Sequence, residues 1–126
     1  MVIWSPDQLA LIDPATELEI AVRQADGGLH RWTPIWVVSV EGQVYVRTWY
    51  RRDSGWYGRA RRSRQARVRV PGLKADVSIE DVGTKAPDSL RSGIDDAYRV
   101  KYGSRGAESM ITPAAQATSL RLAPDR

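Results

Sequence analysis

The sequence predicts a mainly β fold: an antiparallel barrel of about six strands with two or three helices at its ends. Several short segments alternate apolar with polar residues, which is typical of half-buried strands. Glycine and proline turn signals join neighbouring segments over a few residues and so favour hairpins. Helical spacing is confined to three segments of unequal length. The combination of short strands, hairpin turns and few helices indicates a closed antiparallel sheet.

The N-terminal part predicts a short helix followed by a pair of strands. Ser5-Pro6-Asp7-Gln8 is a capping box with proline at the first helical position. Asp13-Pro14 then ends the helix within about two turns. Residues 18–23 alternate as a strand, and a turn at 26–28 leads into a second strand at 29–32.

The middle of the chain predicts a hairpin and then a basic helix. Alternation over residues 36–41 resumes over 44–49 after the turn at Gly42-Gln43. From Ser54 to Gln65 the spacing becomes helical, with an apolar face that includes Trp56 and arginines over the rest of the surface. Ser54-Gly55 is the expected start of this helix.

The C-terminal half predicts two further strands, a long helix and a closing strand. Residues 66–70 and 74–82 alternate on either side of a Pro-Gly turn. Residues 88–102 have helical spacing, with Asp95 and Arg99 as an i,i+4 pair, and the neighbouring acids Asp95-Asp96 are interpreted as part of a solvated helix face. Thr112-Pro113 starts one more helical turn, and a last strand lies at 120–122.

Length and composition restrict the class of protein. At 126 residues we expect one domain, residues 1–126, with one active site at most. The absence of cysteine excludes disulfides and thiolate sites and favours a cytoplasmic setting. We expect no metal site, because His30 is the only histidine, and no membrane segment, because no apolar run approaches the length of a span.

Positive charge is concentrated in one stretch of the chain. Residues 47–69 contain nine arginines and a single acid, whereas the remainder has ten bases and fourteen acids. Guanidinium groups gathered beside a Ser-Gly helix start are typical of a phosphate site. The alternative is a solvated loop whose arginines pair with acids elsewhere.

The order of motifs in this stretch resembles the split-barrel flavin-binding superfamily of pyridoxamine-phosphate oxidase and the deazaflavin-dependent oxidoreductases. The matching residues are Thr33-Pro34-Ile35-Trp36, Tyr45-Val46-Arg47-Thr48, Ser54-Gly55, Arg61-Arg62, Arg67-Val68-Arg69-Val70 and Lys101-Tyr102-Gly103. More narrowly, the chain is similar to a small branch known only as a domain of unknown function. The resemblance implies a Greek-key split barrel and, as cofactor, FMN or a deazaflavin bound at a two-fold dimer interface.

The resemblance also implies which residues would bind the cofactor. Carried over by position, the phosphate ligands are Arg47, Thr48, Ser54 and Gly55, while Trp56 stands where the relatives have a lysine. An arginine at position 51, 52, 59 or 62 would then have to replace that charge, and Trp49 could stack on the ring. The candidate cofactor-binding residues are Arg47, Thr48, Trp49, Arg51, Arg52, Ser54, Gly55, Trp56 and Arg62.

Three functions remain open at this point. The first is a flavin- or deazaflavin-dependent oxidoreductase acting on a small organic molecule, with the cofactor carrying the reaction because no acid–base constellation is evident. The second is a cofactor-free split barrel whose pocket binds another anionic ligand or catalyses a different reaction. Nucleic-acid binding is the third and fits less well, because the arginines surround a helix start and alternate with a buried strand face.

Two further interpretations concern aromatic residues and histidine. Five tryptophans and five tyrosines are more aromatic surface than one small barrel buries easily, so we expect a homodimer with Trp36, Trp49 and Trp56 at or near its interface. His30 is interpreted as a surface strand residue and not as a catalytic base, because no partner residue is identifiable. Catalytic residues stay unassigned.

Overall fold

The computed structural model describes residues 3–48 and 55–125 of the chain. Within these residues seven strands form one curled antiparallel sheet in the order β2-β1-β5-β6-β7-β4-β3. The strands are β1 (Leu18–Val22), β2 (Thr33–Ile35), β3 (Val38–Val40), β4 (Gln43–Val46), β5 (Gln65–Val70), β6 (Leu73–Asp81) and β7 (Leu120–Pro124). The fold is therefore a split barrel, mainly β with helices, as the sequence predicts.

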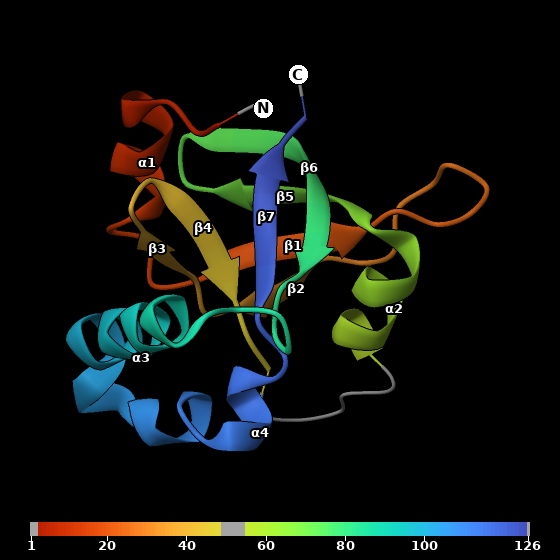
Figure 1. Ribbon diagram of the computed structural model, residues 1–126. Coiled ribbons are helices and arrows are strands. Elements are labelled where there is room, and N and C mark those ends of the chain that lie inside the picture. The colour runs from red at the N-terminus through yellow and green to blue at the C-terminus, as the bar shows by residue number, and fades with distance from the viewer. Residues whose placement is uncertain (1–2, 49–54, 126) are drawn as a thin grey trace.

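Helices surround the sheet on several sides (Figure 1). They are α1 (Pro6–Ile12), α2 (Gly55–Ser63), α3 (Asp88–Tyr102) and α4 (Pro113–Gln116), with 3-10 turns at Gly103–Arg105 and Ala107–Met110. Helix α1 lies at the end of the sheet where the two termini meet, α3 and α4 lie at the opposite end, and α2 lies beside the sheet on the side away from α3. Among the described residues no helix is long and apolar enough to cross a membrane.

Local sequence signals account for most element boundaries. The capping box of α1 is formed, because Ser5 Oγ accepts from the Gln8 amide and the Gln8 side chain accepts from the Ser5 amide. The predicted hairpin is also confirmed, with Val38 opposite Tyr45 and the turn at Glu41-Gly42. Apolar side chains of both strands can then face the core in register.

One predicted strand is wrong. Residues 29–32 do not form a strand, and only an isolated bridge pairs Leu29 with Arg23. The strand that pairs with β1 is instead β2, with Thr33 opposite Ile20. Within the described chain, the connection between the bridge and β2 is bonded to β1 only through the His30 amide and the Val22 carbonyl, and regular pairing with β1 begins at Thr33.

Two apolar clusters hold the elements together. The larger cluster lies inside the curled sheet, where residues of all strands except β3 meet Trp4 and the apolar face of α2. The second cluster packs α3 against β3 and β4, using Ile94, Tyr98 and Tyr102 at four-residue spacing. Burial of such side chains contributes about 1.5–3 kcal/mol each to folding. The two helices α2 and α3 are therefore positioned by different cores.

Pairs between arginines and acids on neighbouring strands add a pH-dependent contribution to stability. Arg67 Nε on β5 donates to Asp76 Oδ1 on β6 at 2.8 Å, and Arg23 Nη2 lies 3.3 Å from the same oxygen. The hydrogen bond from Arg67 lowers the pKa of Asp76 below its ordinary value, and the partial burial of the carboxylate opposes this effect. A lowered folded-state pKa means that the ionised carboxylate stabilises the native state.

We expect Asp76→Asn to be less stable than the native sequence at neutral pH and to lose this disadvantage in acid. The stabilisation by Asp76 is present above the unfolded-state pKa of about 3.9 and disappears as the pH falls through the lower folded-state pKa. Melting temperatures of both proteins at neutral pH and near pH 2 would measure the difference, with exposed Glu108→Gln as a charge-matched control. A difference in melting temperature that stays the same at both pH values would show that the ionised Asp76 carboxylate does not stabilise the native state.

Candidate functional site

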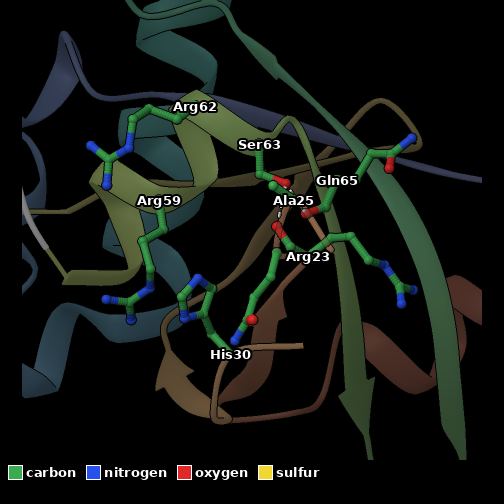
Figure 2. Close-up of a pocket in the computed structure, with 8 residues that line it drawn as sticks. Arg23, Ala25, His30, Arg59, Arg62, Ser63 and Gln65 are labelled. Atoms are coloured by element: carbon green, nitrogen blue, oxygen red, sulfur yellow. Dashed lines mark hydrogen bonds between the residues drawn. The ribbon is translucent and has the colours of Figure 1, made fainter. Parts of the chain in front are cut away.

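A basic pocket opens between α2 and the adjoining ends of β1 and β5 (Figure 2). Its volume is about 670 Å³. We call it the α2 pocket, and it is lined by Arg23, Gln24, Ala25, His30, Arg59, Arg62, Ser63 and Gln65. Four of these eight side chains are arginine or histidine and none is acidic, so the pocket has the electrostatic character of an anion site.

Backbone and hydroxyl hydrogen bonds fix the walls of this pocket. Ser63 at the end of α2 donates through Oγ to the carbonyl oxygens of Arg23, at 2.7 Å, and Gln65, at 3.1 Å. The Arg23 amide donates to the Gln65 carbonyl at 2.9 Å. These bonds join α2, β1 and β5 at one point, so the pocket lies on a rigid part of the fold.

Helical spacing determines which arginines of α2 reach the pocket. Tyr57 and Ala60 are buried in the core below the helix. Arg59 and Arg62, three residues apart, are neighbours on one helix face and both line the pocket. Arg61 lies on another face and pairs with Asp81 at 3.3 Å. The helix therefore presents two of its cations to the pocket.

These two cations have no counter-ion in the described part of the chain. Among the described residues neither Arg59 nor Arg62 forms an ion pair. The Nε atom of Arg59 is buried and finds no hydrogen-bond partner in the described part of the chain. In contrast, Arg23 donates to the Gly27 carbonyl at 2.9 Å and to Asp76. Arg59 and Arg62 are thus the groups available to an anionic ligand.

His30 lies in the connection after β1 and not in a strand. Its amide donates to the Val22 carbonyl at 2.8 Å, while its half-buried imidazole lines the pocket. Figure 2 shows the Arg59 side chain extending from α2 toward the His30 ring. An imidazole there can donate or accept a hydrogen bond at the ligand. Sequence reasoning missed this role because residues 30 and 59 meet only through the tertiary fold.

Arg47, the first predicted phosphate ligand, is used inside the protein. Its side chain is buried, and Nη1 donates to Asp95 Oδ1 at 2.6 Å and to the Met110 carbonyl at 2.8 Å. Nε donates to Ser119 Oγ at 2.8 Å. The guanidinium does not line the α2 pocket. A phosphate could reach the Arg47 guanidinium only by breaking these bonds.

The other predicted site residues lie in several different parts of the structure. Arg62 lines the α2 pocket. Thr48 is buried, with its backbone bonded to the Thr118 hydroxyl, and Gly55 begins α2 in a left-handed conformation, φ 65°. Trp56 is partly buried against the larger core, as its helical spacing predicts. The remaining four, Trp49, Arg51, Arg52 and Ser54, lie outside the described residues.

The interpretation of Asp95 as part of a solvated helix face is wrong. Asp95 is buried, and besides Arg47 its Oδ2 accepts from Gln116 Nε2 at 2.8 Å. Its neighbour Asp96 is exposed and pairs with Arg99 at 2.9 Å, in place of the expected pair between Asp95 and Arg99. The side of α3 that carries Asp95 faces the end of β4, which the helical pattern alone did not indicate.

The arrangement supports binding more clearly than catalysis by side chains. Among the described residues no group of three or more His, Asp or Glu could hold a metal ion. The α2 pocket contains donors for an anion and one imidazole, but no carboxylate beside that imidazole. Its chemistry is recognition of negative charge.

Comparisons with known proteins agree with the fold. Residues 8–122 match a family described as uncharacterized protein conserved in bacteria, DUF2255. A comparison with curated proteins gives no match.

Several solved structures have the same fold at low sequence identity. A conserved hypothetical protein, Rv2991, from Mycobacterium tuberculosis superposes with a TM-score of 0.65 at 14% identity, over 99% of this chain and 83% of that chain. A putative pyridoxamine 5'-phosphate oxidase from Listeria innocua gives 0.62 at 12%, over 94% and 90%. A FAD-binding protein from Mesorhizobium loti gives 0.61 at 14%, over 100% and 93%. An F420 reductase gives 0.58 at 14%, over 98% and 97%. At such identities the likeness shows the fold alone.

We expect Asp95→Ala to destabilise the protein by about 3–5 kcal/mol, because it leaves the Arg47 charge buried without its partner. Asp96→Ala is the matched control: it removes the neighbouring, exposed acid and should change stability by no more than about 0.5 kcal/mol. Urea unfolding of the two variants measures the difference. Equal stability of the two variants would show that the buried pair between Arg47 and Asp95 does not stabilise the fold.

Proposed function

Because this chain belongs to the DUF2255 family and has a split-barrel fold, we propose that it binds a flavin- or deazaflavin-type cofactor and acts as an oxidoreductase on a small organic substrate. The α2 pocket would hold the anionic part of that cofactor. The names of the similar structures, which include a FAD-binding protein and an F420 reductase, support this class of ligand.

The observation that carries the proposal is the buried Nε of Arg59, which has no hydrogen-bond partner among the described residues and lies next to Arg62. A buried donor without a partner costs about 1–3 kcal/mol, and more when it belongs to a charged group. A phosphate or carboxylate in the pocket would remove that cost by accepting from the guanidinium. The pocket volume of about 670 Å³ lies in the range of small-molecule sites, so it fits a mononucleotide cofactor.

The proposal also accounts for the missing lysine. In the superfamily that the sequence resembles, a lysine follows the Ser-Gly segment, whereas this chain has Trp56 there. Trp56 packs against the core and supplies no charge. Arg59 and Arg62 lie on the next turns of the same helix and carry charge into the pocket. The positive charge that would replace the lysine therefore lies on the same helix, three and six residues after Trp56.

The cofactor, when bound, supplies hydride chemistry. The residues of this chain have other tasks. Arg59 and Arg62 bind the negative charge, His30 offers one hydrogen bond, and Ser63 keeps the end of α2 against β1 and β5. Because a guanidinium forms two directed hydrogen bonds to one anion, this arrangement also orients the ligand.

A homodimer is part of the same proposal. Trp32, Trp36 and Trp56 are each only partly buried in the single chain. Tryptophan combines a large apolar surface with one polar group and is enriched at protein interfaces. The superfamily that the sequence resembles places its flavin between two subunits, so a second copy would complete the site.

A specific observation favours a second candidate, an anionic ligand other than a flavin. Arg47, which the resemblance assigns to the flavin phosphate, is withdrawn into a buried ion pair. The α2 pocket could then serve a different phosphorylated or carboxylated molecule as a cofactor-free split barrel. The arginine-rich surface fits nucleic acid less well, because Arg61, Arg67 and Arg69 are paired with acids.

We expect Arg59→Ala and Arg62→Ala each to weaken the binding of FMN or a deazaflavin about tenfold or more, since a charge-assisted contact contributes about 1.5–3 kcal/mol. Arg64→Asn is the matched control. Arg64 is exposed, does not line the α2 pocket and has φ 62°, a conformation that asparagine tolerates.

Titration calorimetry with FMN, with a deazaflavin and with inorganic phosphate separates the candidates. Binding of phosphate but of neither cofactor would support the second candidate. Equal losses in all three variants would mean that the basic surface acts only diffusely, and no binding of any of the three would exclude the pocket as an anion site.

We expect sedimentation velocity at micromolar concentration to show a particle of twice the 14.1 kDa chain mass. The physical reason is the apolar area that the three half-covered tryptophans would bury at an interface. A monomer under these conditions would contradict the dimer, and it would leave the α2 pocket to be tested by titration alone.

A further inference from the structure

A second pocket, about 490 Å³ in volume, lies between α3 and the edge strand β3. We call it the α3 pocket. It is lined by Asp13, Val38, Ser39, Val40, Gly93, Asp96, Ala97, Val100 and Lys101, none of which lines the α2 pocket. Most of its wall is aliphatic. An apolar pocket with a few polar groups is the ordinary form of a small-molecule site.

The shape of this pocket follows from small residues on one face of α3. Gly93 and Ala97 are four residues apart and both face β3. A side chain at position 93 would come within 3.4 Å of Val40 Cγ1 and would occupy space that is now open. Val100 is 89% exposed, which is unusual for valine. An apolar molecule in the pocket could bury part of it.

Lys101 supplies an amine to this apolar wall. Its Nζ donates to the Val37 carbonyl at 2.8 Å, which holds the side chain in place. Among the described residues Lys101 forms no ion pair. Burial lowers its pKa, while the charge of Asp13 opposes the shift. The other two lysines of the chain, Lys74 and Lys85, are both exposed.

The charged and titratable groups around the amine are already engaged. Asp13, at the end of α1, accepts from Ser39 Oγ at 2.6 Å, and Asp96 accepts from Arg99 at 2.9 Å. The Tyr102 ring centroid lies 5.4 Å from Nζ, and its hydroxyl is bonded to backbone at Val37 and Thr16. Two carboxylates at the rim disfavour an anionic ligand. A neutral molecule suits this pocket best.

We propose that Lys101 captures small apolar aldehydes in the α3 pocket by forming an imine. The lone pair of the neutral amine attacks the carbonyl carbon and forms a C–N bond. The carbonyl oxygen then leaves as water with the two protons of the amine, which gives Lys101–N=CHR. No oxidant or reductant is required. The apolar group R packs against Val38, Val40 and Ala97, and the reaction does not depend on a cofactor in the α2 pocket.

Reductive trapping tests the proposal on the intact protein. Isovaleraldehyde is added at limiting concentration with sodium cyanoborohydride, and the alkylated lysines are located by peptide mass spectrometry. We expect Lys101 to carry several times as much adduct as the exposed Lys74 or Lys85, because the apolar wall holds the aldehyde beside an amine whose pKa is lowered by burial. Equal labelling of the three lysines would overturn the proposal.

A smaller aldehyde, formaldehyde, and a pocket variant distinguish the effect of the apolar wall from the reactivity of the Lys101 amine. Formaldehyde is too small to need the apolar wall, so it reports on the reactivity of the Lys101 amine alone. Ala97→Leu fills the pocket from α3, and we expect it to lower isovaleraldehyde labelling of Lys101 several-fold without changing formaldehyde labelling. Unchanged isovaleraldehyde labelling in this variant would show that the pocket plays no part. The comparison among the three native lysines decides the question even if the variant does not fold.

Discussion

The buried ion pair between Arg47 and Asp95 is the interaction on which the rest of the structure depends. It joins the end of β4 to α3, and the guanidinium also donates to Met110 and Ser119 in the segment that leads to β7 and to the Arg91 carbonyl on α3. Burying two charges is costly unless they are paired and hydrogen-bonded in this way. The Arg47 side chain therefore holds α3 and the segment before β7 against the end of β4. Because its bonds are used there, it is not available to bind a ligand.

The other described arginines of residues 47–69 differ in whether they pair with an acid. Arg67 and Arg69 lie on β5 and pair with Asp76 and Glu19 on the two neighbouring strands. Acids on other elements therefore neutralise several of the arginines in residues 47–69. Among the described arginines of residues 47–69, only Arg59, Arg62 and Arg64 form no ion pair, and of these Arg59 and Arg62 line the pocket formed where β1 and β5 meet α2. Charge available for binding is concentrated there.

The two pockets differ in chemistry because two different cores place their helices. Helix α2 packs on the inside of the curled sheet and presents arginine, whereas α3 packs outside β3 and β4 and presents glycine, alanine and a single lysine. The helices lie on different sides of the sheet (Figure 1). An anionic ligand and a neutral carbonyl compound would therefore not compete for the same space. Each site can be tested without disturbing the other.

The sequence by itself determined most of the elements and the family. The capping box at Ser5, the hairpin around Gly42 and the apolar spacing of α3 are local signals, and the order of motifs identified the split barrel. Only the tertiary structure decided which cations face a ligand. Arg47 meets Asp95 across 48 residues, and Arg59 reaches His30 only because β1 pairs with β5. Strand order and register make these contacts, and neither can be read from periodicity, which reports the face of a residue but not its partner.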